Sequence, residues 1–347
     1  LAATSKHTLV TATRRRFGIR FQIWPLGLQM IVDQFVLASE IGGAAYALQL
    51  MTGVSFRAWA IPVALLIWVL LWRATFGAIE HSVAVLGLLT LCFVVAAFRL
   101  EPDWTGVAHG FIPHRPASMI AQYIFLSVAI LGATVSPYLV TFYSSGAVEE
   151  KWTVKDLVPN RFVAGLGMSF GSTIAMAVVV VSALVLAPQG IVVDSFDKAA
   201  HVLDGVFGRW GLWLFAASLG IGCAGAALEI GLDVSYIAAQ CLGWNWSENQ
   251  HPKDEARFAM VYTIAVALAI VPSVAGVDPL QLTMFSMVLT VLALPLVIGP
   301  LLVIMNDRDY LKTHTNGWIA NIAVTTVLAL AFVLAVIAIP AQLLGGS

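Results

Sequence analysis

Charged side chains are scarce in this chain. Aspartate, glutamate, lysine and arginine make up 11% of its 347 residues, whereas 60% are hydrophobic. The mean hydropathy of +0.90 lies far outside the range of soluble globular proteins. A formal net charge of −1 leaves no basic footprint, so we expect no nucleic-acid partner. The composition predicts a single-domain, all-α membrane protein.

Cysteine is rare, and the motifs of common catalysts are absent. Cys92, Cys223 and Cys241 lie within apolar segments and form neither a CxxC pair nor a Cys/His cluster. This pattern excludes a disulfide framework and a structural zinc site. The sequence also lacks a Ser/His/Asp order, a metal-protease spacing and a phosphate loop. We therefore expect no enzyme and no bound cofactor.

The chain has no initiator methionine and no signal peptide. It opens on Leu1 and continues directly into polar sequence. This start predicts a fragment in which residues 1–20 form a cytosolic stub after a missing helix. Residues 21–347 are then predicted to form one transmembrane domain.

Long apolar runs are the main feature that the sequence does contain. Each is near the twenty residues that a helix needs to cross a bilayer, and polar, Pro-bearing or Gly-bearing connections separate them. Nine runs are predicted as spans: 22–51, 57–72, 80–98, 118–143, 162–187, 209–241, 257–274, 280–305 and 318–340.

Lysine and arginine are distributed unevenly over the connections. If alternate loops face alternate sides, thirteen of the eighteen lie on the side of the N-terminal stub. Because positive residues favour the inside, the stub is predicted to lie in the cytosol. We expect a monomeric, multi-pass protein of the cytoplasmic (inner) membrane, surrounded by the lipid bilayer.

One apolar run contains helix-breaking residues, Gly132-Ala133-Thr134-Val135-Ser136-Pro137-Tyr138. Pro137 lacks a backbone N–H, and Gly132 is a poor helix former. In lipid, a break persists only where other helices or a water-filled cavity satisfy the freed backbone groups. Paired half-helix ends near the midplane form the ion or substrate site of many transporters. The structural alternative is a packing kink in which Thr134 and Ser136 only bond to preceding carbonyls.

Four carboxylates fall in the interior of the predicted spans, where charges are costly and usually face the bundle interior or a cavity. Asp33 and Glu40, seven residues apart, share one face of the first span. Glu40 precedes small residues that permit close helix approach, so functional and structural roles both stay open. Glu229 and Asp233 are four residues apart, and two carboxylates this close cannot both stay ionised in a low dielectric. They predict a proton or cation site, with a structural or rim-exposed role as the alternative.

These motifs resemble those of the Nramp family of divalent metal-ion transporters. The break, with the following Tyr143-Ser144-Ser145, is similar to the sixth-helix motif GATVMPHN and its following His-Ser. Further stretches resemble family motifs in the same order along the chain. Ser39-Glu40-Ile41-Gly42-Gly43 resembles AE-x-IG, and Pro102-Asp103-Trp104 resembles PDW. Ser286-Met287-Val288 resembles SQV, Leu294-Pro295 resembles LP, and Asn306-Asp307-Arg308 resembles the polar turn that follows. The match covers nearly the whole chain.

The resemblance implies a LeuT-like fold of two inverted five-helix repeats, with the first and sixth helices unwound at the midplane. The nine spans would be helices three to eleven, the first two being missing. In the family, a DPGN motif on the first helix supplies Asp and Asn metal ligands, so the fragment alone is expected not to transport. The resemblance implies that the Ala133 carbonyl and Ser136 face the metal. It also implies a substrate pathway formed by four residues: Thr134, Pro137, Met287 and, at the cytosolic exit, Tyr138.

Five positions depart from the family pattern. Ser136 stands where the family has its metal-binding methionine, Tyr138 where it has the next histidine and Leu139 where it has the asparagine after that. Leu37 replaces a third-helix aspartate, and Met287 replaces the tenth-helix glutamine. Thioether sulfur favours transition metals, whereas hydroxyl and carbonyl oxygens suit Mg, Ca or Mn, and Mg²⁺ keeps several waters. The losses of histidine and aspartate remove groups that a proton would use. The family has a magnesium-transporting branch that is similar in these respects.

We therefore expect transport of a divalent metal cation by alternating access, with a harder ion (Mg or Mn) favoured and proton coupling weak or altered. Four carboxylates are candidates for a proton or secondary cation path: Glu40, Asp33, Glu229 and Asp233. Two alternatives stay open. One is an organic-solute symporter of the amino-acid type with the same fold, and the other is a non-transporting Nramp-like sensor.

Overall fold

The computed structural model describes residues 1–73, 84–112, 120–247, 249–250 and 252–345 of the chain. These residues form helices and their connections, without any strand, as the sequence predicts. Seven helical segments are long and apolar enough to cross a membrane, and Ala84–Arg99 and Trp318–Leu334 are shorter apolar helices. The run predicted at 80–98 begins outside the described residues, and the count of nine spans stays a prediction.

The long helices coincide with the predicted apolar runs. Their bounds are α3 (Ile19–Thr52), α4 (Phe56–Arg73), α6 (Leu91–Arg99), α8 (Ile120–Thr134), α9 (Pro137–Glu149), α10 (Leu157–Val185), α13 (Gly211–Leu242), α14 (Ala256–Ala275), α15 (Pro279–Ile304) and α17 (Trp318–Gly345). Short helices and 3-10 turns fill the connections: α1 (Ala2–Ser5), α2 (Leu9–Phe17), α7 (Trp104–His109), α11 (Phe196–Ala200), α12 (Asp204–Phe207), α16 (Arg308–Leu311), η1 (Leu88–Thr90), η2 (Val154–Asp156), η3 (Ala187–Gln189), η4 (His201–Leu203) and η5 (Gly208–Trp210).

Local chemistry sets the ends of these helices. α13 stops at Gly243 and α14 at Gly276, both with a left-handed backbone (φ of 74° and 87°) that glycine adopts without strain. α15 begins with Asp278, whose side chain accepts a hydrogen bond from the N–H of Gln281, and with Pro279 in the first turn.

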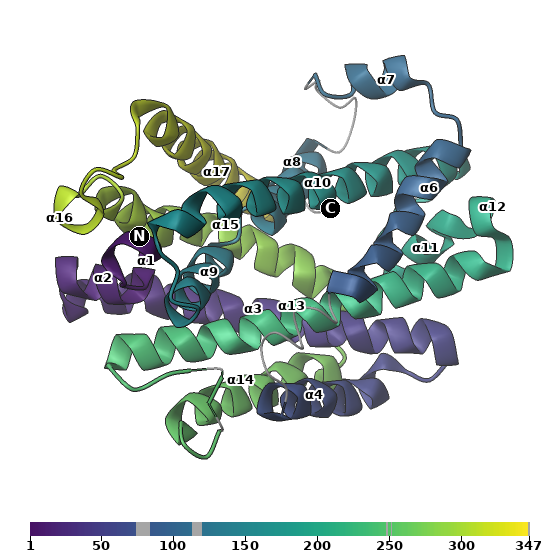
Figure 1. Cartoon of the computed structure of the whole chain (residues 1–347). Coiled ribbons are helices and arrows are strands. Elements are labelled where there is room, and N and C mark those ends of the chain that lie inside the picture. The colour runs from purple at the N-terminus through teal and green to yellow at the C-terminus, as the bar shows by residue number, and fades with distance from the viewer. Residues whose placement is uncertain (74–83, 113–119, 248, 251, 346–347) are drawn as a thin grey trace.

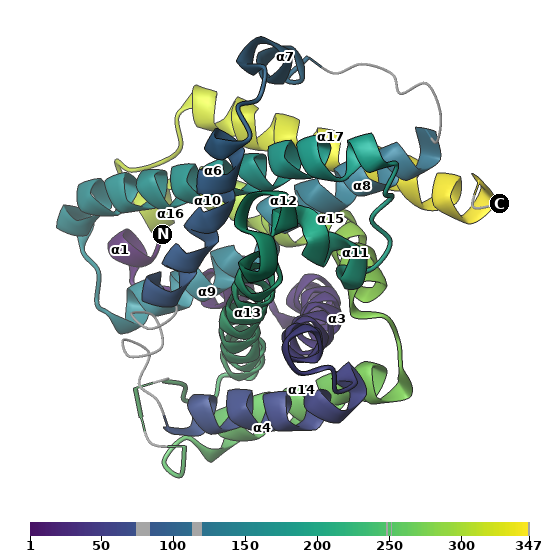
Figure 2. The ribbon, with the colours of Figure 1, turned by 90° about the vertical axis from the view of Figure 1, so that its right-hand side faces the viewer.

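Helices α3 and α13 run side by side through the middle of the molecule (Figures 1 and 2). Helices α4 and α14 pack across them on one side, and α8, α15 and α17 lie on the other. Residues 231–240 of α13 are all buried, which is typical of a helix enclosed by others. The main apolar core lies between these helices, and a second, smaller core joins α6 to α10.

Small residues bring α3 close to its neighbours, as the sequence predicts. A Cβ atom on Gly43 would lie 2.7 Å from the Sγ of Cys223 on α13. One on Gly42 would lie 2.8 Å from the Oγ of Ser273 on α14. The glycine pair therefore allows α3 to contact α13 and α14 directly.

The N-terminal residues are folded onto the domain. Leu9 and Val10 of α2 are buried, and α1 and α2 lie beside α16 (Figure 1). The hydroxyl of Thr8 donates to Oε1 of Gln240 on α13 at 2.7 Å, and Nε2 of Gln240 donates to the Oγ of Ser145 on α9 at 2.9 Å. This buried chain of hydrogen bonds ties α2 to α13 and α9. A boundary between stub and domain at residue 20 stays a prediction.

The Pro102-Asp103-Trp104 motif has a local structural role. The exposed carboxylate of Asp103 accepts hydrogen bonds from the hydroxyl and N–H of Thr105 (2.6 and 3.0 Å) and from the N–H of Gly106 (3.1 Å). Asp103 is thus the N-cap of α7. These hydrogen bonds, that of the Thr105 hydroxyl first, hold the pKa of Asp103 below its ordinary value.

The cap of α7 is expected to depend on pH. Because folding lowers the pKa of Asp103, its contribution to α7 is complete above the ordinary aspartate range. That contribution is lost as the pH falls through the lowered pKa. Hydrogen exchange of the amides at 105–109, corrected for intrinsic rates, should show protection falling with acid in the wild type and absent at all pH values in Asp103→Ala. Asp103→Asn, which caps without titrating, should keep pH-independent protection; acid-sensitive exchange in this variant would contradict the assignment.

Candidate functional site

The predicted break is confirmed. Helix α8 ends at Thr134 and α9 begins at Pro137, with Ser136 in an extended conformation between them (φ −89°, ψ 130°). In a continuous helix, the carbonyl of Ala133 would accept a hydrogen bond from the N–H of residue 137. Since that residue is a proline, the Ala133 carbonyl lacks its helical partner. The last carbonyls of α8 also carry the partial negative charge of a helix C-terminus, which favours a cation.

The two hydroxyls at the break behave differently. Thr134 Oγ1 lies 3.2 Å from the carbonyl oxygen of Ile130 and 2.9 Å from that of Leu131, so it bonds back to its own helix. Thr134 thus follows the structural alternative, in which a hydroxyl at the break only bonds to preceding carbonyls. Ser136 is only 6% exposed, and its side chain does not cap α9. Its hydroxyl therefore stays a candidate ligand.

Helix α15 touches the break through its main chain. A Cβ atom on Gly132 would lie 2.1 Å from the carbonyl oxygen of Met287 and 3.0 Å from Cγ2 of Val291. Met287, predicted to line the substrate pathway, is buried beside the break. The absence of a side chain at Gly132 is therefore what allows α8 and α15 to meet here.

Tyr138, in the first turn of α9, lies among the four intramembrane carboxyl groups. Its side chain is within electrostatic reach of Glu229, Glu40, Asp33 and Asp233. The structure thus brings these five predicted residues into one region between α3, α9 and α13. Pro137 is buried at the start of α9.

The hydrogen bonds of Asp233 and Glu40 differ from the pairs that the sequence suggested. Oδ2 of Asp233 accepts from the hydroxyl of Thr141 at 2.8 Å and from Nε2 of Gln29 at 3.1 Å. Asp33 acts on Asp233 electrostatically across the α3–α13 contact. Glu40 accepts a hydrogen bond from the thiol of Cys223 on α13, which fits the structural role that the sequence left open.

Sequence reasoning missed Gln29 and Thr141 as members of this region. One signal was available for Gln29: Gln22, Gln29 and Asp33 follow at intervals of seven and four, which places three polar residues on one face of an apolar helix. Thr141 lies one helical turn after Tyr138, on the same face of α9.

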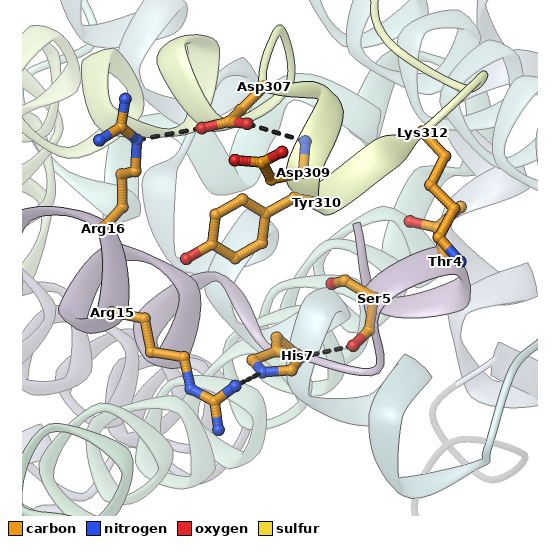
Figure 3. Close-up of a pocket in the computed structure, with 9 residues that line it drawn as sticks. All are labelled: Thr4, Ser5, His7, Arg15, Arg16, Asp307, Asp309, Tyr310 and Lys312. Carbon is orange, nitrogen blue, oxygen red and sulfur yellow. Dashed lines mark hydrogen bonds and ion pairs between the residues drawn. The ribbon is translucent and has the colours of Figure 1, made fainter.

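One cavity lies beside α9 and a second lies among the N-terminal helices, and neither includes Ala133 or Ser136 in its lining. A largely apolar cavity of about 810 Å³ lies between the N-terminal residues, α9, α10, α15 and α17, and Leu139 and Tyr143 line it. A polar cavity of about 590 Å³ lies between α1, α2 and α16 (Figure 3). There Asp307 pairs with Nε of Arg16 at 3.0 Å and accepts from the N–H of Asp309 at 2.9 Å. The polar turn at Asn306-Asp307-Arg308 thus holds the N-terminal segment in place.

Within the part of the chain that the structure describes, no group of three or more His, Cys, Asp or Glu side chains could hold a metal ion. The oxygens that this chain offers at the break are the main-chain carbonyl of Ala133 and the hydroxyl of Ser136. Oxygen ligands of this kind suit hard cations such as Mg²⁺ and Mn²⁺.

Comparison with known proteins places these features in context. The family model described as natural resistance-associated macrophage protein-like (Nramp) matches residues 1–340. The divalent metal cation transporter MntH of Caldanaerobacter subterraneus is 27% identical over 69% of this chain and 55% of its own length. MntH of Ralstonia nicotianae is 28% identical over 80% of this chain and 65% of its own length. MntH 1 of Pseudomonas aeruginosa is 27% identical over 93% and 75%. The chain thus spans less than two thirds of the first two relatives.

The same architecture occurs in solved structures. The crystal structure of the Eremococcus coleocola manganese transporter in complex with an aromatic bis-isothiourea substituted compound aligns with a TM-score of 0.79 at 19% identity. The alignment covers 98% of this chain and 76% of that one. A mutant of the same transporter aligns with a TM-score of 0.78, covering 99% and 76%. The predicted LeuT-like, all-helical fold is therefore confirmed.

Proposed function

Because the chain belongs to the natural resistance-associated macrophage protein-like (Nramp) family, we propose that the full-length protein carries divalent metal cations across the cytoplasmic membrane by alternating access. The multi-pass membrane character follows from the family and from the seven long apolar helices. The relatives described above are named as transporters, which supports a transporter rather than an enzyme. The observation that carries the proposal is the broken helix, in which Pro137 removes the helical partner of the Ala133 carbonyl and the Ser136 side chain is buried.

In this proposal the cation meets the Ala133 carbonyl and Ser136, directly or through water. The exposed end of α8 at Thr134, the turn at Pro137 and the buried Met287 border its path. Tyr138 lies between the break and the carboxyl groups of α3 and α13. These carboxyl groups attract cations and provide the proton or secondary cation path.

The ligand chemistry favours a hard ion, Mg²⁺ or Mn²⁺. Ser136 offers a hydroxyl oxygen where the resemblance places a thioether, and oxygen ligands suit these ions better than Cd²⁺. The solved structures that share the fold are of a protein named as a manganese transporter, which agrees with Mn²⁺ as one cargo.

Uptake by the full-length protein in liposomes tests the proposal. We expect Mg²⁺ or Mn²⁺ flux with little accompanying acidification of the lumen. Tight proton co-transport together with a strong Cd²⁺ preference would contradict the assigned selectivity. Absence of flux together with absence of metal-dependent thermal stabilisation would support the sensor alternative, and amino-acid flux without metal flux would support the organic-solute symporter.

Ser136→Met is expected to change the preferred ion. A thioether at the break should raise the ratio of Cd²⁺ to Mn²⁺ uptake about tenfold or more, equivalent to about 1.4 kcal/mol in relative stabilisation. Dual-metal uptake in liposomes measures this ratio. Ser127→Met is the matched control, because Ser127 lies inside α8, away from the break, and its hydroxyl donates to the carbonyl of Tyr123. An unchanged ratio in Ser136→Met, or an equal rise in the control, would remove Ser136 from the cation site.

A further inference from the structure

Three buried oxygen atoms between α3 and α13 have no hydrogen-bond partner: Oε1 of Gln29, Oδ2 of Asp33 and Oδ1 of Asp233. Their side chains are 0%, 1% and 0% exposed. An unpartnered polar atom in such a place costs about 1–3 kcal/mol. Three acceptors in one buried region therefore require an additional donor.

The donors already present do not meet this need. Nε2 of Gln29 has two hydrogens and lies within hydrogen-bond distance of Thr141 Oγ1 (2.8 Å) and Asp233 Oδ2 (3.1 Å). The same glutamine side chain also interacts with Asp33. The single hydroxyl hydrogen of Thr141 faces Asp233 Oδ2 and the Tyr138 carbonyl. Neither donor reaches the three unpartnered oxygens.

Among the residues that the structure describes, no compensating cation lies in this cluster. The titratable groups nearest to it are Glu40 on α3, Tyr138 on α9 and Glu229 on α13. Helix α14 buries Tyr262, and α15 has no charged residue from Pro279 to Ile304. Arginine occurs only near the ends of the packed helices, and Arg257 at the start of α14 lies over the ring of Trp244. Two carboxylates in low dielectric without a cation cannot both stay ionised.

We propose that Asp33 and Asp233 form a buried carboxyl pair that binds one proton, held on Asp33. Of the two side chains, Asp233 is the one that stays ionised, because one of its oxygens accepts hydrogen bonds from both Thr141 and Gln29. A proton on Oδ2 of Asp33 turns one unpartnered acceptor into a donor for one of the two remaining acceptors of the cluster. Among the described residues, no third acidic, histidine or cysteine side chain completes a metal-binding group with this pair, so the donor set fits a proton better than a divalent ion.

The pair is linked to the broken helix. Thr141, which bonds Asp233, lies one turn inside the α9 segment that begins at Pro137. The charge of the pair therefore acts on the half-helix that borders the proposed metal site. Loss of the proton leaves two negative charges beside α9, so the position of α9 and hence metal uptake respond to pH. This last step rests on the proposed transport function.

Infrared difference spectroscopy of the full-length protein over a pH titration tests the proton independently of transport. Deprotonation should remove a carboxylic acid C=O band in the wild type. That band should be absent in Asp33→Asn, retained in Asp233→Asn and unchanged in the surface control Asp254→Asn. Thr141→Val, which removes a donor to the Asp233 carboxylate, should shift the loss of the band to higher pH. The Thr141→Val measurement tests the proton site even if an aspartate variant fails to fold.

Three results would overturn the proposal: a band that persists in Asp33→Asn, a band that Thr141→Val leaves at the same pH, or a band that added Na⁺ or Mg²⁺ abolishes at constant pH. The last would identify a metal-cation site instead. In liposomes, the ratio of Mn²⁺ uptake at low pH to that at high pH should lie closer to one in Asp33→Asn than in the wild type. If the infrared results hold but no Mn²⁺ flux is seen in the wild type, the proposed function fails while the proton site stands.

Discussion

Gly132→Ala should abolish metal uptake by the full-length protein and destabilise it by about 3 kcal/mol or more. Added methyl groups in a packed core cost about 1–3 kcal/mol. Here the new Cβ would lie 2.1 Å from the main-chain oxygen of Met287 and 3.0 Å from Val291. A backbone carbonyl cannot move aside as a flexible side chain can, so α8 and α15 must separate at the break. Thermal unfolding and liposome uptake measure the two effects.

Gly146→Ala provides the matched control. Gly146 lies inside α9, and a Cβ atom there would have nothing within 4 Å. Alanine is the better helix former by about 0.5–1 kcal/mol, so this variant should be as stable as the wild type or slightly more so. Wild-type stability and uptake in Gly132→Ala would show that α8 does not touch α15 at Met287.

Gln240→Leu should lower the stability of the protein by about 2–3 kcal/mol. Gln240 is buried and joins the Thr8 hydroxyl to the Ser145 hydroxyl. Leucine fills a similar volume but leaves both hydroxyls without this partner, at about 1–1.5 kcal/mol each. Because α2 is then released from α13 and α9, the amides of α2 should also exchange faster. Thermal unfolding in detergent and hydrogen exchange measure these changes.

Gln189→Leu serves as the comparison, since Gln189 is exposed and bonds only to the carbonyl of Val185. Its unfolding temperature should stay within experimental error of the wild type. Equal losses in both glutamine variants would mean that the Thr8–Gln240–Ser145 connection contributes nothing specific.

The sequence predicted the helices and the break because both depend on local chemistry. An apolar run of bilayer length must satisfy its backbone internally and becomes a helix, so the run at 209–241 anticipates α13 closely. Pro137 removes a hydrogen bond wherever it stands in a helix, which marks the break without knowledge of its neighbours. The bonding of the Thr134 hydroxyl to preceding carbonyls was also predicted, as one of two alternatives.

The partners of the buried carboxylates could not be predicted in this way. Asp33 and Asp233 lie on helices that are 200 residues apart in the chain, and only the packing of α3 against α13 brings them together. Spacing within one helix suggested Glu229 as the partner of Asp233, whereas the hydrogen bonds of Asp233 go to Gln29 and Thr141. An uncharged glutamine in an apolar run gives a weak signal until the facing helix is known.

The contact at Gly132 also bears on how this protein can diverge. Its partner on α15 is a main-chain oxygen, which every residue type supplies equally. Position 287 can therefore change its side chain during evolution while the junction of α8 and α15 is preserved. Position 132 has no such freedom. Mutational drift at this junction should thus accumulate on the α15 side, where it changes the side chain and leaves the architecture intact.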